Sequence, residues 1–121
     1  MPDLKVNIAG VEFKNPIIVA SGFYGYGQEY QQFHPLSRLG GVTLNGTTLG
    51  AKEGSPTPRI AEAPSGILSN TGMPNPGVQT LLNGALPQLS HSGTVLIANL
   101  AAGTALDFPK LPGRSRIVAW T

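Results

Sequence analysis

Three apolar segments of this sequence are each followed by small or polar residues that could bind a ligand. The segments and the residues that follow them are 16–20 before Ser21-Gly22, 42–44 before Asn45-Gly46, and 94–98 before Asn99. Hydroxyl and amide groups donate and accept hydrogen bonds, and glycine lets a ligand approach the backbone closely. The chain has no cysteine, which excludes thiolate metal sites, disulfides and a cysteine nucleophile. These residues therefore favour binding of a polar ligand, although the glycine-rich residues 21–27 also fit a flexible turn.

A long loop, residues 54–77, lies between the second and third apolar segments. It is too rich in glycine and proline for a helix interior or a central strand. Long loops in compact domains are usually functional or disordered, and binding groups concentrate on them. Residues 58–62 and 67–68 could form a small hairpin within it, with Arg59 and Glu62 as a surface ion pair.

The apolar segments are typical of strands buried on both faces of a parallel sheet. Helical spacing predicts a helix over residues 29–38, shortened or kinked at Pro35. A second helix is expected after residues 75–77, because an apolar stripe follows them. Its members are Val78, Leu81, Leu82, Ala85 and Leu89. Alternating strands and helices predict an α/β fold whose functional site lies at the carboxyl ends of the strands.

The remaining segments give more local predictions. Alternation in residues 4–8 and 11–13 predicts an N-terminal β-hairpin with one buried face. Residues 104–111 could begin a helix capped by Thr104, although prolines interrupt it. His34 and His91 are interpreted as surface or capping residues.

Asn45-Gly46 permits two interpretations. Between β-forming residues this pair is a strong hairpin signal, with residues 47–49 as the return strand. Alternatively the strand ends here, and polar residues 45–48 lie at the mouth of a barrel.

Composition limits the classes of partner. Only 12% of the 121 residues are charged, about half the usual share, so part of the surface is expected to be covered by a cofactor, a partner subunit or a missing part of the chain. A net charge of +2 is too small to indicate nucleic-acid binding. No apolar run has the length of a signal peptide or membrane span, so the expected location is the cytoplasm.

Several short motifs occur together in a specific order and spacing. They are Phe13-Lys14-Asn15-Pro16-Ile17, Ala20-Ser21-Gly22, Tyr24-Gly25-Tyr26-Gly27-Gln28-Glu29-Tyr30, Thr47-Thr48-Leu49, Pro56-Thr57-Pro58-Arg59-Ile60-Ala61-Glu62, Ser65-Gly66-Ile67-Leu68, Gly72, Asn75-Pro76-Gly77 and Ile97-Ala98-Asn99. The set resembles the N-terminal part of dihydroorotate dehydrogenase of class 1B, the catalytic subunit of the NAD-linked form. The resemblance extends from residue 1 to about residue 108.

That resemblance implies a TIM (β/α)8 barrel, of which residues 1–121 would form a partial FMN-binding domain. It implies oxidation of dihydroorotate to orotate in pyrimidine biosynthesis, with FMN as hydride acceptor and a cysteine on a later loop as base. It also implies an oligomer, and a partner subunit that carries FAD and an iron–sulfur cluster.

The resemblance also assigns binding residues, but no catalytic residue within this chain. The residues matched to FMN contacts are Ser21, Asn45, Gly46 and Asn99. Those matched to substrate contacts are Asn45, Ser69, Asn70, Thr71, Gly72 and Met73.

Two positions depart from the family pattern. A lysine is usual where Asn45 stands, and an amide cannot supply its positive charge. An asparagine is usual where Ser69 stands, and a hydroxyl loses the two-pronged hydrogen bonding of an amide.

Two other functions remain open from the sequence. One is a truncated, non-catalytic barrel fragment that lacks the base and the phosphate-binding half and whose exposed strand edge needs a partner. The other is a generic flavin or phosphate binder on the same fold.

Overall fold

A parallel sheet of three strands forms the centre of the protein, in a computed structural model that describes residues 2–107, 110 and 111. The strands are β3 (Ile18–Val19), β4 (Gly41–Thr43) and β7 (Val95–Ile97), in the order β3-β4-β7. In the register, Val42 of β4 pairs with Val19 on one side and with Leu96 on the other. The predicted mixed α/β architecture with a parallel sheet is therefore present.

Burial differs among the three strands. The middle strand β4 is the best covered, with Val42 completely buried, whereas Ile17 and Ile18 of the β3 segment are 58% and 37% exposed. The prediction that the β3 segment is buried on both faces is thus wrong for this structure. The reason is that the described residues leave Ile17 and Ile18, in and next to this edge strand, largely uncovered.

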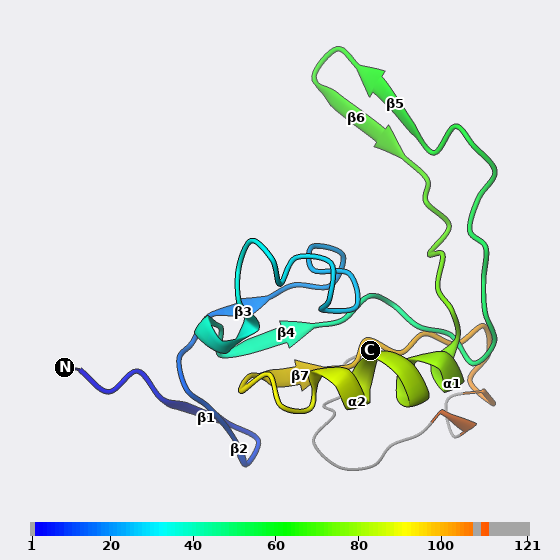
Figure 1. Ribbon diagram of the computed structural model, residues 1–121. Coiled ribbons are helices and arrows are strands. Elements are labelled where there is room, and N and C mark those ends of the chain that lie inside the picture. The colour runs from blue at the N-terminus through cyan, green and yellow to red at the C-terminus, as the bar shows by residue number, and fades with distance from the viewer. Residues whose placement is uncertain (1, 108–109, 112–121) are drawn as a thin grey trace.

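One continuous helical segment covers the sheet (Figure 1). In the chain it follows the long loop and precedes β7. It consists of α1 (Val78–Thr80), a π-helical turn η2 (Leu81–Ala85) and α2 (Leu86–Leu89). Proline has no N–H and clashes with the carbonyl four residues earlier, and a wider π turn just before Pro87 accommodates it. The predicted apolar stripe is confirmed, since Val78, Leu81 and Leu89 are all buried.

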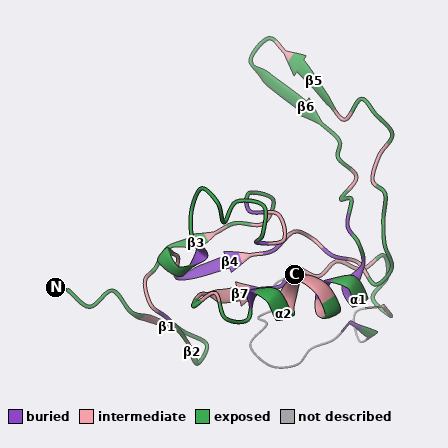
Figure 2. Ribbon diagram, viewed as in Figure 1, coloured by how far each residue is buried: buried purple, intermediate pink, exposed green. Residues whose placement is uncertain are grey.

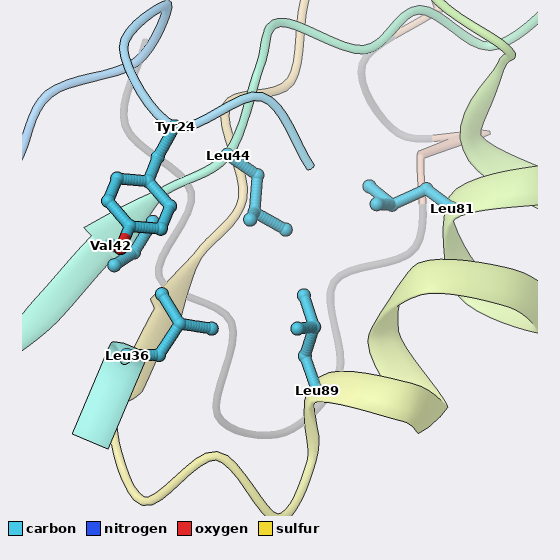
Figure 3. Close-up of a cluster of buried hydrophobic side chains, with 6 residues drawn as sticks. All are labelled: Tyr24, Leu36, Val42, Leu44, Leu81 and Leu89. Atoms are coloured by element: carbon cyan, nitrogen blue, oxygen red, sulfur yellow. The ribbon is translucent and has the colours of Figure 1, made fainter. Parts of the chain in front are cut away.

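The main core lies between this helix and the sheet (Figure 3). Its buried members are Tyr24, Leu36, Val42, Leu44, Leu81 and Leu89. They come from segments far apart in the sequence: the glycine-rich turn after β3, the residue after Pro35, β4 and the residue that follows it, and the η2 and α2 parts of the helical segment. Burial of apolar surface therefore fixes the turn after β3 against the helix, which is a condition for building a site between them.

The first expected helix does not form. Residues 29–33 make turns, and only a short 3-10 helix, η1 (Leu36–Arg38), follows Pro35. Proline disfavours the α conformation in the residue before it and removes a helical donor. Phe33 is 71% exposed, so the apolar spacing that predicted the helix does not produce a buried face. The same segment places His34 at the surface, as expected.

Two hairpins extend from the central sheet. At the N-terminus, β1 (Val6–Ile8) pairs antiparallel with β2 (Val11–Phe13), but only Phe13 of this pair is buried. In the long loop, β5 (Ile60–Ala63) pairs with β6 (Gly66–Ser69). This second hairpin projects from the body on two extended segments of the long loop, one just before β5 and one just after β6, which we call the limbs (Figure 1). The hairpin is almost wholly exposed (Figure 2).

Three local possibilities that the sequence raised are not found in the structure, one of them an alternative interpretation of Asn45-Gly46. Residues 47–49 form no return strand, because Thr47 instead bridges in parallel to Leu100. Arg59 does not pair with Glu62; its Nε and Nη2 donate to the carbonyls of Ser55 and Glu53 at 2.7 and 2.9 Å. Residues 104–107 form a turn rather than a helix, and the rest of that expected helix lies partly outside the described residues. Within the described chain, no helix has the length and hydropathy needed to cross a membrane.

Two tyrosines, Tyr24 which is buried and Tyr26 which is partly buried, make the stability of the fold pH-dependent. Burial raises the pKa of Tyr26 and of Tyr24 above the ordinary value for tyrosine. The folded chain therefore keeps these protons to higher pH than the unfolded chain does. Their stabilising contribution is complete below about pH 10 and is lost as the pH rises through the raised pKa values.

We expect the free energy of unfolding to fall when the pH is raised from about 9 to about 11.5, and the fall to be smaller in Tyr26→Phe. Urea unfolding followed by circular dichroism at the two pH values measures this. The matched control is Tyr30→Phe at an exposed position. Equal pH dependence in the two variants would contradict the prediction.

Candidate functional site

The carboxyl ends of the three parallel strands are joined by side-chain hydrogen bonds. Ser21, after β3, donates through Oγ to the carbonyl of Leu44 at 2.9 Å. Asn99, after β7, donates through Nδ2 to Ser21 Oγ at 3.0 Å. The Ser21 hydroxyl therefore donates to one partner and accepts from the other, which fixes its orientation. Ser21 and Asn99, which are 78 positions apart in the sequence, become neighbours.

Asn45 holds the start of the glycine-rich turn. Its Oδ1 accepts the N–H of Gly22 at 3.1 Å, and its own N–H donates to the carbonyl of Gly25 at 3.0 Å. The turn is therefore folded back onto the end of β4. Of the two interpretations of Asn45-Gly46, the structure agrees with the second: β4 ends before Asn45, and polar residues follow it.

Gly46 is the point where the long loop reaches the strand ends. A β-carbon placed on Gly46 would lie 3.0 Å from Sδ of Met73 and 3.6 Å from Nδ2 of Asn99. Three predicted site residues from separate parts of the chain therefore converge here. Any side chain at position 46 would displace the Met73 thioether.

Ser69 and Asn70, two other predicted substrate residues, lie in the loop on the hairpin side of Met73. Ser69 is in β6 and pairs with Ile60. Asn70 donates from its backbone N–H to the carbonyl of Arg59 at 2.8 Å, and its Oδ1 accepts from Ser55 Oγ at 3.0 Å. These contacts stabilise the loop itself, so of residues 69–73 it is Met73 that reaches the strand ends.

The two limbs of the loop are packed backbone to backbone. The N–H of Ser55 donates to the carbonyl of Thr71 at 3.0 Å. A β-carbon on Gly72, whose φ is +67°, would lie 2.4 Å from the backbone nitrogen of Ser55. A β-carbon on Gly54 would lie 2.5 Å from the carbonyl oxygen of Thr71. Only glycine allows this approach, so Gly72 sets the loop conformation and need not touch a ligand.

The site is neutral and has unused hydrogen-bonding capacity. All the predicted site residues are uncharged. Among the described residues, no hydrogen bond uses Nδ2 of Asn45 or Oδ1 of Asn99. These atoms are a donor and an acceptor available to a polar ring. The described chain contains no cluster of histidine, aspartate and glutamate suited to a metal ion.

Sequence reasoning missed the organising residue of the loop, Asn75. From the sequence, residues 75–77 are assigned to the start of a helix and to the family motif set, without a separate role for Asn75, and the helix indeed begins at Val78. Asn75 is only 7% exposed, and its side chain bonds to Thr48, Gly77 and Met73. A polar residue between two prolines in a long loop was the available signal.

Comparison with known proteins gives a consistent result. The family model described as dihydroorotate dehydrogenase matches residues 3–109. Dihydroorotate dehydrogenase B (NAD(+)), catalytic subunit, of Petrotoga mobilis is 47% identical over 108 residues, which are 89% of this chain and 36% of that protein. The protein of the same name from Maridesulfovibrio salexigens is 43% identical over 111 residues, or 92% of this chain and 36% of that protein.

A solved structure agrees. The crystal structure of DHODH from Eimeria tenella in complex with ferulenol matches with a TM-score of 0.64 and 25% identity, over 84% of this chain and 29% of that one. The present chain therefore spans about a third of the length of the curated relatives that it matches.

Proposed function

Because this chain belongs to the dihydroorotate dehydrogenase family, we propose that it forms the N-terminal part of a TIM barrel that oxidises dihydroorotate to orotate in de novo pyrimidine biosynthesis. The observation that carries the proposal is the convergence of Gly46, Met73 and Asn99 at the carboxyl ends of the parallel strands. Functional sites of such barrels lie at this end.

The residues at the strand ends fit a flavin. An isoalloxazine ring presents both acceptors and an N–H donor along one edge, and Asn45 Nδ2 and Asn99 Oδ1 complement these groups. A β-carbon on Gly22 would meet nothing within 4 Å, which leaves the backbone beside β3 accessible. We propose that Ser21, Asn45, Gly46 and Asn99 hold FMN, which supplies hydride acceptance when bound.

Within this proposal the loop residues have separate roles. Ser69, Asn70, Thr71, Gly72 and Met73 form the substrate loop, and Met73 closes over the strand ends. Met73 provides an apolar, polarisable contact that suits one face of a planar ring. Asn45 and Asn99 orient the polar edges of substrate and flavin. These 121 residues contain no cysteine, so the general base that the family resemblance implies is not among the residues assigned here.

The NAD-linked subclass and its electron-transfer partner belong to the same proposal. The names of the relatives describe a catalytic subunit, which supports a partner subunit. We propose that this partner carries FAD and an iron–sulfur cluster and passes electrons to NAD, in a cytoplasmic oligomer. The low share of charged residues, 12%, supports a surface that is covered by such partners.

Flavin binding tests the proposal directly. Titration of FMN with the 121-residue chain should quench flavin fluorescence, and added orotate should then shift the visible flavin spectrum. Asn99→Ala should weaken FMN binding by about tenfold, because one or more hydrogen bonds to the ring are lost.

Asn83→Ala is the matched control, since Asn83 is exposed on the helical segment. A chain that neither quenches the flavin nor responds to orotate would contradict the proposal and favour the non-catalytic fragment.

A further inference from the structure

The buried amide of Asn75 connects three segments of the chain. Its Oδ1 accepts the backbone N–H of Thr48 at 3.1 Å and the N–H of Gly77 at 3.0 Å. Its Nδ2 donates to the carbonyl of Met73 at 3.0 Å. The amide therefore links the segment after β4, the start of the helical segment, and Met73, the last residue of the substrate loop 69–73.

The partners fix which way the amide points. Two of the groups facing Oδ1 are backbone N–H donors, and the group facing Nδ2 is a carbonyl acceptor. A flipped amide would place donor against donor and acceptor against acceptor. The backbone of Asn75 is also held, since it exchanges two hydrogen bonds of 2.8 Å with Lys52. Asn75 is thus a fixed point from which the loop can be oriented.

Met73 needs such an external constraint. Its φ is +55°, in the left-handed region that residues with a side chain rarely adopt. The hydrogen bond from Asn75 Nδ2 to the Met73 carbonyl acts directly on this residue. The side chain of Met73 in turn lies against Gly46 and close to Asn99 Nδ2.

We propose that Asn75 is a positioning residue for the substrate loop: its Nδ2 donor holds Met73 in the left-handed conformation that places the thioether over Gly46. Its Oδ1 performs a separate task by joining the loop to the helix and to Thr48. The inference about ligand binding rests on the function proposed above, whereas the placement of Met73 does not.

Asn75→Asp separates the two tasks, because a carboxylate keeps the acceptor for Thr48 and Gly77 but has no donor for Met73. Asn83→Asp makes the same chemical change at an exposed position and is the matched control. The chain has only two methionines, so selective methyl labelling gives a Met73 signal that Met73→Leu assigns. We expect a nuclear Overhauser contact between the Met73 methyl and Gly46 in the unmodified chain and in Asn83→Asp, and its loss in Asn75→Asp.

A second measurement covers the case in which Asn75→Asp does not fold. In the unmodified chain, the Nδ2 protons of Asn75 should exchange with water at least about tenfold more slowly than those of Asn83. The reason is that the Asn75 side chain is buried and its Nδ2 is hydrogen-bonded, whereas Asn83 is exposed. Equal exchange rates would overturn the proposal. So would a Met73–Gly46 contact that persists in folded Asn75→Asp.

Orotate titration of the FMN-loaded chain then separates this inference from the proposed function. Binding at least about fivefold weaker in Asn75→Asp than in Asn83→Asp would support both. If the unmodified chain binds no orotate but Asn75→Asp still releases Met73, the proposed function fails and the positioning role stands. If orotate binds equally to both variants, the role of Asn75 in ligand binding is wrong.

Discussion

Leu44→Ala should lower the free energy of unfolding by about 2–5 kcal/mol, the largest single effect on stability that we expect. Leu44 is completely buried in the core between sheet and helix, together with Leu81 and Leu89 (Figure 3). Truncation removes apolar contacts and leaves a cavity that the surrounding strand and helix cannot fill without moving. Urea unfolding followed by circular dichroism measures the change.

The same residue couples stability to the site. Its carbonyl accepts the Ser21 hydroxyl, so a shift of the backbone at Leu44 also moves the strand-end cluster. Leu106→Ala is the matched control, since this leucine is 80% exposed, and its effect should stay within about 0.5 kcal/mol. Equal destabilisation by the two substitutions would show that the described core is not the stabilising one.

Gly72→Ala should abolish the conformation of the substrate loop while leaving the core folded. The new methyl group would lie 2.4 Å from the Ser55 nitrogen and 2.9 Å from the Gly54 carbonyl carbon, so backbone must move. The φ of +67° adds strain for any residue with a β-carbon. Orotate binding to the FMN-loaded chain should weaken by about a hundredfold, because the proposed substrate loop no longer packs limb against limb.

Gly66→Ala is the matched control, because a β-carbon there meets nothing within 4 Å and the residue lies in the same long loop, at the hairpin that the two limbs carry. It should bind orotate like the unmodified chain. Amide hydrogen exchange at Ser55, whose N–H bonds to Thr71, reports the loop without any ligand. Retained protection of that amide in Gly72→Ala would show that the loop tolerates a side chain at this position.

Local patterns in the sequence predicted two kinds of element: strands and helices with a buried apolar face, and the hairpin β5–β6, whose two strands are close in sequence. The apolar runs at β4 and β7 and the stripe on the helical segment gave the right strands and helix, because burial on a sheet demands those periods. The hairpin β5–β6 followed from turn residues at its tip. By contrast, the spacing in residues 29–38 suggested a helix, and Pro35 outweighed it.

The site could be predicted only in part. The rule that ligands lie at the carboxyl ends of parallel strands correctly brings Ser21 and Asn99 together, and a hydrogen bond of 3.0 Å joins them. Nothing in local sequence shows that Met73 reaches Gly46, or that Ser69 and Asn70 lie along the projecting loop instead. Those placements depend on how the two limbs of the loop pack, which involves residues 17 positions apart, as between Gly72 and Ser55.

The sequence by itself determined the family, the order of strands and helix, and the set of polar residues available to a ligand. These follow from residue types and short spacings, which are local properties of the sequence. Only the tertiary structure decided which of those residues meet, and that the buried amide of Asn75 holds Met73 in place. The physical reason is that a buried polar group must find its hydrogen-bond partners wherever packing puts them, and packing is a property of the whole fold.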